Sequence, residues 1–93
     1  MFFNAHLINK TSKIVESLTS QNLKISFGES CTGGLLSALF TEISGVSKVL
    51  DRSFVTYSNK AKIEMLGVDE EVLTKYGAVS RQTAKEMALG VIK

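Results

Sequence analysis

The first segment with residue types suited to chemistry is Gly28–Gly34, where Ser30, Cys31 and Thr32 precede two consecutive glycines. It lies between an apolar strand pattern and an apolar helix pattern. Such a junction presents unpaired backbone N–H groups and a partial positive charge, and paired glycines let an oxyanion approach the backbone closely. Gly28 precedes Ser30 by two residues, as in the elbow that exposes a nucleophilic serine, but Thr32 replaces the elbow's second glycine. Two interpretations stay open: a serine nucleophile, or a hydroxyl that only caps the helix.

The second segment, Val55–Lys62, is another strand end that runs into a helix, and it carries Tyr57, Lys60 and Lys62. Open α/β sheets place their sites at the carboxyl ends of strands. A lysine partly removed from water there can serve as base to a serine hydroxyl. Two lysines two residues apart on a helix point in different directions, so we expect only one to face Ser30. The alternative is two solvated lysines on a surface helix.

Other reactive residue types favour structural interpretations. His6 lies far in sequence from both segments, so a Ser-His-Asp triad is not predicted. Cys31 is interpreted as a half-buried small residue rather than a thiol nucleophile. Glu29 is expected to hydrogen-bond the loop, and Asp51 and Arg52 to form a local ion pair. With one cysteine and one histidine, a zinc site is not expected, and we predict no metal or organic cofactor.

Composition excludes several classes of protein. The 93 residues are 44% hydrophobic, and eleven Lys and Arg against nine Asp and Glu give a formal charge of +2 without charged runs. That spread argues against a nucleic-acid-binding face, which needs clustered basic residues. No stretch approaches the roughly eighteen apolar residues of a membrane span, and one cysteine excludes a disulfide framework. We therefore expect a cytoplasmic protein that binds neither nucleic acid nor membrane.

Apolar periodicity predicts the elements that must position these residues. Five helices are expected. The first is Asn4–Gln21, and the second runs from Gly33-Gly34 to a stop at Gly45. The third is Lys60–Leu66 with a cap at Ser58 or Asn59, a short fourth runs from Asp69 to before Gly77, and the last follows a cap at Ser80. Two or three strands are expected, with the clear ones at Lys24–Phe27, closed by Gly28, and Ser53–Tyr57, which can start near Val49. The second helix is apolar nearly all round and should be buried on more than one side.

The predicted fold class is α/β, a three-layer α/β/α arrangement with a mostly parallel sheet, because strand, helix and strand alternate. Parallel sheets need helices on both faces and several strands, and a two-stranded sheet leaves its edges unpaired. Residues 1–93 are therefore interpreted as a single domain that is incomplete at its C-terminal side. A second copy in a homo-oligomer, or a complementing second half, would have to complete it.

Three blocks of sequence together resemble the C-terminal domain of the CinA (competence/damage-inducible) family. The blocks are Glu29–Gly34 (ESCTGG), Asp51–Lys62 (DRSFVTYSNKAK) and Gly77–Ser80 (GAVS), and the resemblance extends from about Ile25 to Lys93. The combination of ESCTGG with VTYSN-x-AK is specific, unlike a lone glycine motif. Stand-alone members of this family are nicotinamide-nucleotide amidases, which hydrolyse nicotinamide mononucleotide to nicotinic acid mononucleotide and ammonia in pyridine-nucleotide salvage.

The resemblance implies the same amidohydrolase activity on a small-molecule nucleotide substrate. It makes Ser30 the nucleophile, Lys62 its general base, and Tyr57 a candidate for orienting or polarising the reacting groups. It assigns substrate and oxyanion binding to the turn residues Cys31, Thr32, Gly33 and Gly34.

The sequence also departs from the family's pattern. Gly28 stands where the family usually has Ala, and Lys60 where it usually has an acidic residue. The family's domain continues with a strand, a Gly-rich segment and further elements that contribute to the substrate pocket, and these lie outside the 93 residues. The alternatives to an amidohydrolase are therefore an inactive truncated remnant, or a nucleotide-binding or interaction module without turnover.

Overall fold

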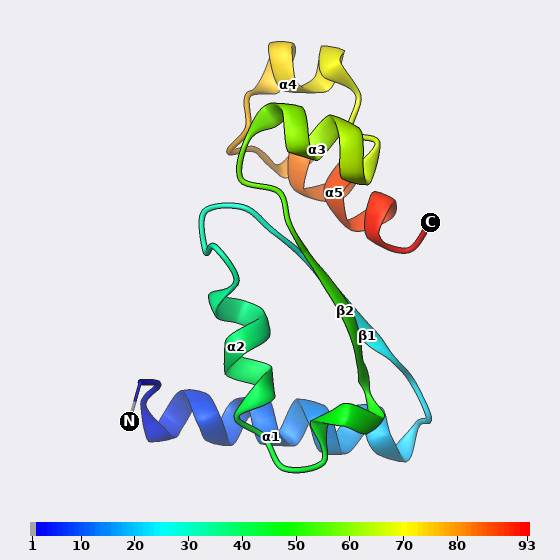
Figure 1. Ribbon diagram of the computed structural model, residues 1–93. Helices are drawn as coiled ribbons and strands as arrows, with labels where there is room; N and C mark the ends of the chain where they lie inside the picture. The colour runs from blue at the N-terminus through cyan, green and yellow to red at the C-terminus, as the bar shows by residue number, and fades with distance from the viewer. Residues whose placement is uncertain (1) are drawn as a thin grey trace. The chain divides into compact units, whose positions relative to one another are not determined.

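The computed structural model describes residues 2–93. These residues form five α-helices, one short 3-10 helix and two strands (Figure 1). In chain order the elements are α1 (Ala5–Ser20), β1 (Ile25–Glu29), α2 (Leu35–Thr41), η1 (Val46–Lys48), β2 (Leu50–Val55), α3 (Asn59–Leu66), α4 (Glu70–Tyr76) and α5 (Arg81–Val91). The predicted α/β class is confirmed. None of the helices in this part of the chain has both the length and the apolar content needed to cross a bilayer.

The strands β1 and β2 pair in one sheet. The Ile25 N–H donates to the Val49 carbonyl at 2.7 Å where the strands begin, and the Thr56 N–H donates to the Glu29 carbonyl at 2.8 Å where they end. Because start pairs with start and end with end, the strands are parallel, as the strand–helix–strand order predicts. The two residues that follow them, Ser30 and Thr56, therefore leave the same end of the pair.

The chain divides into two compact units, and the first comprises the residues up to Ser26 together with Leu35–Arg52. Within it α1 contacts α2, and α2 contacts η1 (Figure 1). The Asn4 side chain accepts the Leu7 N–H at 2.8 Å and caps α1, so the predicted first helix is confirmed. The buried apolar side chains of this unit are Val15, Leu39, Phe40, Ile43 and Val49.

The second unit comprises Phe27–Gly34 and Ser53–Lys93, and in it α3 and α4 both pack against α5. Its core consists of Leu66, Val68, Leu73 and Met87, with Phe54, Ile63 and Val91 packed against it. The three helices begin at side-chain caps, Ser58, Asp69 and Ser80, and the predicted starts of all three are confirmed.

The contact between α3 and α5 is close because Gly90 has no side chain. A Cβ at this position would lie 2.0 Å from the Leu66 carbonyl oxygen, far inside van der Waals contact. Since α3 also carries Lys62, this contact with α5 fixes the helix that positions the lysine.

Two predicted glycine stops are wrong. The sequence predicts that Gly28 closes the first strand, but β1 continues through it to Glu29, and the missing side chain makes room for Val91 and Leu66. The sequence also predicts that Gly45 ends the second helix. Instead α2 ends at Thr41, and Gly45 adopts φ 85° as the residue that starts η1.

Two further elements differ from expectation. The burial of α2 differs along its length: Leu39 and Phe40 are buried, but Leu35 and Leu36, one turn earlier, are 46% and 39% exposed. The apolar pattern shows which side chains of a helix could be buried. Which of them are buried depends on the elements that pack against it, and for α2 these are mainly α1 and η1. β2 ends at Val55, so the residues up to Tyr57 belong to the connection into α3.

Candidate active site

The turn Ser30–Gly34 leaves the end of β1 in a conformation that requires glycine. The Gly33 N–H donates to the Ser30 carbonyl at 3.0 Å, which closes the turn. Gly33 and Gly34 have φ values of +59° and +105°, and residues with a Cβ rarely adopt such angles. The paired glycines of the sequence therefore shape the turn that follows the serine.

Ser30 and Lys62 converge on one backbone oxygen. The Lys62 Nζ donates to the Tyr57 carbonyl at 2.9 Å, and the Ser30 Oγ donates to the same carbonyl at 3.5 Å. The serine contact is at the long limit for a hydroxyl donor, so this hydroxyl is weakly held and free to turn toward a better acceptor. The structure thus brings the predicted nucleophile and the predicted base together at the end of β2.

The two lysines of the second segment have different environments, as expected. Lys62 is 1% exposed, whereas Lys60 lies on the surface and faces Glu64 at 3.8 Å across one turn of α3. Burial of an amine is costly unless it is hydrogen-bonded, and the Tyr57 carbonyl supplies that bond. A lysine amine held inside the protein beside a serine hydroxyl is the arrangement in which lysine serves as a base.

Tyr57 contributes to this cluster through its backbone. Its side chain is 73% exposed, while its carbonyl accepts from both Ser30 and Lys62. The resemblance assigns an orienting function to the tyrosine. In the structure its contacts with Ser30 and Lys62 are made by the peptide carbonyl. The phenol is left on the surface beside the cluster.

The Glu29 carboxylate hydrogen-bonds the turn, as the sequence predicts. Glu29 is 3% exposed, and its Oε1 accepts the Thr32 hydroxyl at 2.7 Å. A carboxylate at this depth needs such a donor. Thr32 therefore acts on Glu29 through its side chain as well as contributing its backbone to the turn.

Thr56 belongs to the site, although the sequence reasoning did not select it. It is fully buried, and both its N–H, at 2.8 Å, and its hydroxyl, at 3.4 Å, donate to the Glu29 carbonyl. These bonds tie the residue before Tyr57 to the residue before Ser30. The available signal was a hydroxyl residue at the end of an apolar strand.

Cys31 is exposed, not half-buried as expected. It follows Ser30 in a turn whose side chains are held by Glu29 and Tyr57, and neither contact involves the thiol. The prediction was wrong because apolar neighbours in sequence do not cover a residue at the tip of a turn.

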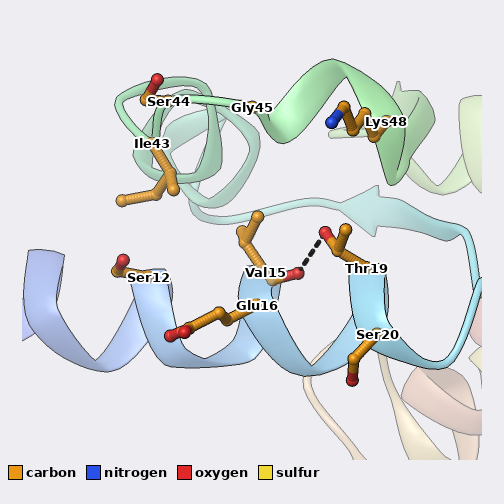
Figure 2. Close-up of a pocket in the computed structure, with 9 residues that line it drawn as sticks. All are labelled: Ser12, Val15, Glu16, Thr19, Ser20, Ile43, Ser44, Gly45 and Lys48. Carbon is orange, nitrogen blue, oxygen red and sulfur yellow. Dashed lines mark hydrogen bonds between the residues drawn. The ribbon is translucent and has the colours of Figure 1, made fainter.

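The first unit contains a concavity whose lining shares no residue with the cluster of Ser30, Tyr57 and Lys62. Figure 2 shows it between α1 and the segment from Ile43 to Lys48. Its volume is about 340 Å³. Its lining consists of Ser12, Val15, Glu16, Thr19, Ser20, Ile43, Ser44, Gly45 and Lys48. The Thr19 hydroxyl is already bonded to the Val15 carbonyl at 2.7 Å (Figure 2). The lining includes neither Ser30 nor Lys62, so the predicted chemistry does not reside there.

Comparison with protein families matches residues 8–93 to the family model described as CinA C-terminal domain. A putative competence-damage inducible protein of Acetivibrio thermocellus is 58% identical over 76 residues, which are 82% of this chain and 18% of that protein. The nicotinamide-nucleotide amidohydrolase PncC of Enterobacter agglomerans is 51% identical over 80 residues, 86% of this chain and 49% of that protein. The chain thus spans about a fifth of the longer relatives and half of the shorter one.

Solved structures give the same relationship. The competence/damage inducible protein CihA from Agrobacterium tumefaciens superposes with a TM-score of 0.95 at 49% identity, over 99% of this chain and 56% of that one. A competence-damaged protein (CinA) superfamily protein from Escherichia coli gives a TM-score of 0.91 at 33% identity, over 99% and 55%. In both structures somewhat less than half of the chain has no counterpart in these 93 residues.

Proposed function

Because the chain belongs to the CinA C-terminal domain family, we propose that it is the nucleophile-bearing part of an amidohydrolase. Its reaction is the deamidation of nicotinamide mononucleotide to nicotinic acid mononucleotide and ammonia, in cytoplasmic pyridine-nucleotide salvage. The observation that carries the proposal is the convergence of the Ser30 hydroxyl and the buried Lys62 amine on the Tyr57 carbonyl. The name of the PncC relative supports the choice of substrate.

In the proposed reaction Ser30 is the nucleophile. Its hydroxyl turns from the weak contact with the Tyr57 carbonyl, gives its proton to the Lys62 amine, and its Oγ bonds to the carboxamide carbon. The protonated Lys62 then donates to the departing nitrogen, and ammonia leaves. Water gives a proton to Lys62 and attacks the Ser30 ester. The bond between the acyl carbon and Oγ then breaks, Lys62 returns the proton to Oγ, and the acid is released. The carbonyl of Tyr57 keeps the Nζ in place throughout.

The negative charge that develops on the carboxamide oxygen requires backbone donors. The Gly33 N–H is engaged by the Ser30 carbonyl at 3.0 Å, so we assign the donors to the Thr32 and Gly34 amides. Gly33 then contributes by shaping the turn, and Cys31 by lining the approach to Ser30.

Turnover is proposed to require completion of the domain. The chain corresponds to 56% of CihA and 49% of PncC, and part of the apolar surface of α2 is exposed at Leu35 and Leu36. The completing partner is a second half of the domain, supplied in trans or within a longer chain, or a second copy. A module that binds the nucleotide without turnover is the second candidate, favoured by this same partial coverage.

The test is ammonia release from nicotinamide mononucleotide, measured with the chain alone and after addition of a polypeptide that carries the remaining part of the CihA-type domain. Turnover that disappears in Ser30→Ala and persists in Lys60→Met supports the amidohydrolase. Nucleotide binding by calorimetry with no turnover in either preparation supports the binding module. Neither binding nor turnover, from a complex that is folded, rejects both.

A further inference from the structure

The residue immediately before the nucleophile has an environment that chemistry at Ser30 does not require. Glu29 is the last residue of β1, it is 3% exposed, and its Oε1 accepts the Thr32 hydroxyl at 2.7 Å. Burial of a carboxylate costs free energy unless donors compensate it, and a hydroxyl bonded to a carboxylate is among the stronger neutral-donor hydrogen bonds. An exposed side chain is enough to cap a helix at the surface, so capping alone does not explain why this glutamate is buried.

The Glu29–Thr32 hydrogen bond spans Ser30. It joins the side chain before the nucleophile to the side chain two residues after it, while the Gly33 N–H bonds to the Ser30 carbonyl at 3.0 Å. These two bonds close the turn from the side-chain and the backbone side. The position of the Ser30 Oγ therefore depends on whether Thr32 is held.

The backbone of Glu29 fixes the other half of the site. Its carbonyl accepts the Thr56 N–H at 2.8 Å and the Thr56 hydroxyl at 3.4 Å, and Thr56 is fully buried. The next residue, Tyr57, carries the carbonyl on which Ser30 and Lys62 converge. One residue thus connects the turn of the nucleophile to the acceptor of the base.

We propose that Glu29 is a positioning residue for this reaction: through Thr32 it holds the Ser30 turn, and through Thr56 it sets that turn against the Tyr57 carbonyl. The effect on rate rests on the proposed function, whereas the effect on the order of the turn does not.

The first measurement is backbone amide exchange by NMR in Glu29→Ala and Thr32→Val, both of which remove the Glu29–Thr32 bond. We expect the Gly33 amide to exchange at least about tenfold faster than in the wild type, because the turn loses one buried hydrogen bond. Amides in α5 should keep their rates. Glu29→Gln keeps an acceptor oxygen and should recover most of the protection lost in Glu29→Ala. Thr74→Val, which removes a hydroxyl bonded to the Glu70 carbonyl on α4, is the matched control.

The second measurement is made with the chain completed by a polypeptide that carries the remaining part of the CihA-type domain. It is the rate at which a fluorophosphonate labels Ser30, together with kcat and KM for nicotinamide mononucleotide. We expect labelling and kcat to fall at least about tenfold in Thr32→Val, with KM changed less than about twofold, in a variant that remains folded by circular dichroism. If Glu29→Ala does not fold, Thr32→Val decides the question. Unchanged Gly33 exchange in Thr32→Val overturns the proposal. If wild-type Ser30 neither labels nor turns over substrate in the completed domain, the proposed function fails, and the exchange data alone decide the role of Glu29.

Discussion

The Nζ of Lys62 lies 2.9 Å from the backbone oxygen of Tyr57, and Lys62 itself is 1% exposed. The two residues lie on either side of the Ser58 cap, so the first turn of α3 brings the Lys62 amine back to the backbone that follows β2. A buried amine has few ways to satisfy its hydrogen-bonding capacity, and a fixed backbone carbonyl is one that needs no conformational change. The base of the proposed reaction is thereby held by the backbone of the segment that joins β2 to α3.

Lys62→Met tests this function of the amine. Methionine fills a similar volume without a donor, and the Tyr57 carbonyl retains the Ser30 hydroxyl as a partner. We expect the amidase rate to fall by roughly 10²–10⁴-fold, the usual contribution of a general base, with the unfolding free energy in urea changed by no more than about 1 kcal/mol.

Lys60→Met is the matched control, because Lys60 is exposed on the same helix and pairs only loosely with Glu64 at 3.8 Å. Its rate should stay within about twofold of the wild type, as expected for an exposed ion pair. Equal losses in the two variants would show that positive charge near the site matters, and not the buried amine.

Gly90→Ala should destabilise the second unit. The added Cβ would lie 2.0 Å from the Leu66 carbonyl, so α3 and α5 must separate. Overpacking of this kind costs about 3 kcal/mol, which urea unfolding followed by circular dichroism will measure.

Gly67→Ala separates this steric effect from backbone strain. Gly67 has φ +67° and nothing within 4 Å of an added Cβ, so it carries only the conformational penalty of about 1–2 kcal/mol. A cost for Gly90→Ala no larger than for Gly67→Ala would contradict the close crossing of α3 and α5.

Gly28 and Val91 form a coupled pair. Alanine at position 28, which the family usually has, would bring a Cβ to 2.9 Å from Val91 Cγ2 and 3.3 Å from Leu66 Cδ1. We expect Gly28→Ala to cost about 1 kcal/mol of unfolding free energy. In the Val91→Ala background the same change should be neutral or stabilising, because alanine restricts the unfolded chain more than glycine does. A double-mutant cycle with no coupling would show that Val91 moves aside freely.

The sequence predicts what depends on short stretches of chain. The starts of α3, α4 and α5 were predicted near Ser58, Asp69 and Ser80, and each depends on one side chain and the amides two or three residues later. The two strand ends with Ser30 and Lys62 are also local patterns, and the parallel order of their strands brings them to one end. The proximity of Ser30 and Lys62 could therefore be expected from the sequence.

What the sequence does not predict depends on distant residues or on backbone atoms. Gly28 lies within β1, and its missing side chain makes room for Val91, which is distant in sequence, near Lys93. The common acceptor of Ser30 and Lys62 is a peptide carbonyl. A sequence motif does not show which backbone carbonyl accepts a hydrogen bond. Thr56 escaped notice for a related reason, since its burial and its bonds to Glu29 arise from strand pairing.

Gly34→Ala tests the shape of the turn. Gly34 has φ +105°, which residues with a Cβ avoid, yet an added Cβ would meet only Val55 at an ordinary 3.7 Å. The cost is therefore backbone strain of about 1–3 kcal/mol, relieved when the turn relaxes and Ser30 moves. We expect the fluorophosphonate labelling of Ser30 and the amidase rate to fall together. Gly77→Ala, at φ +83° with no atom within 4 Å, supplies a comparable strain after α4. Full activity in Gly34→Ala, with a stability loss like that of Gly77→Ala, would show that the reaction tolerates a displaced turn.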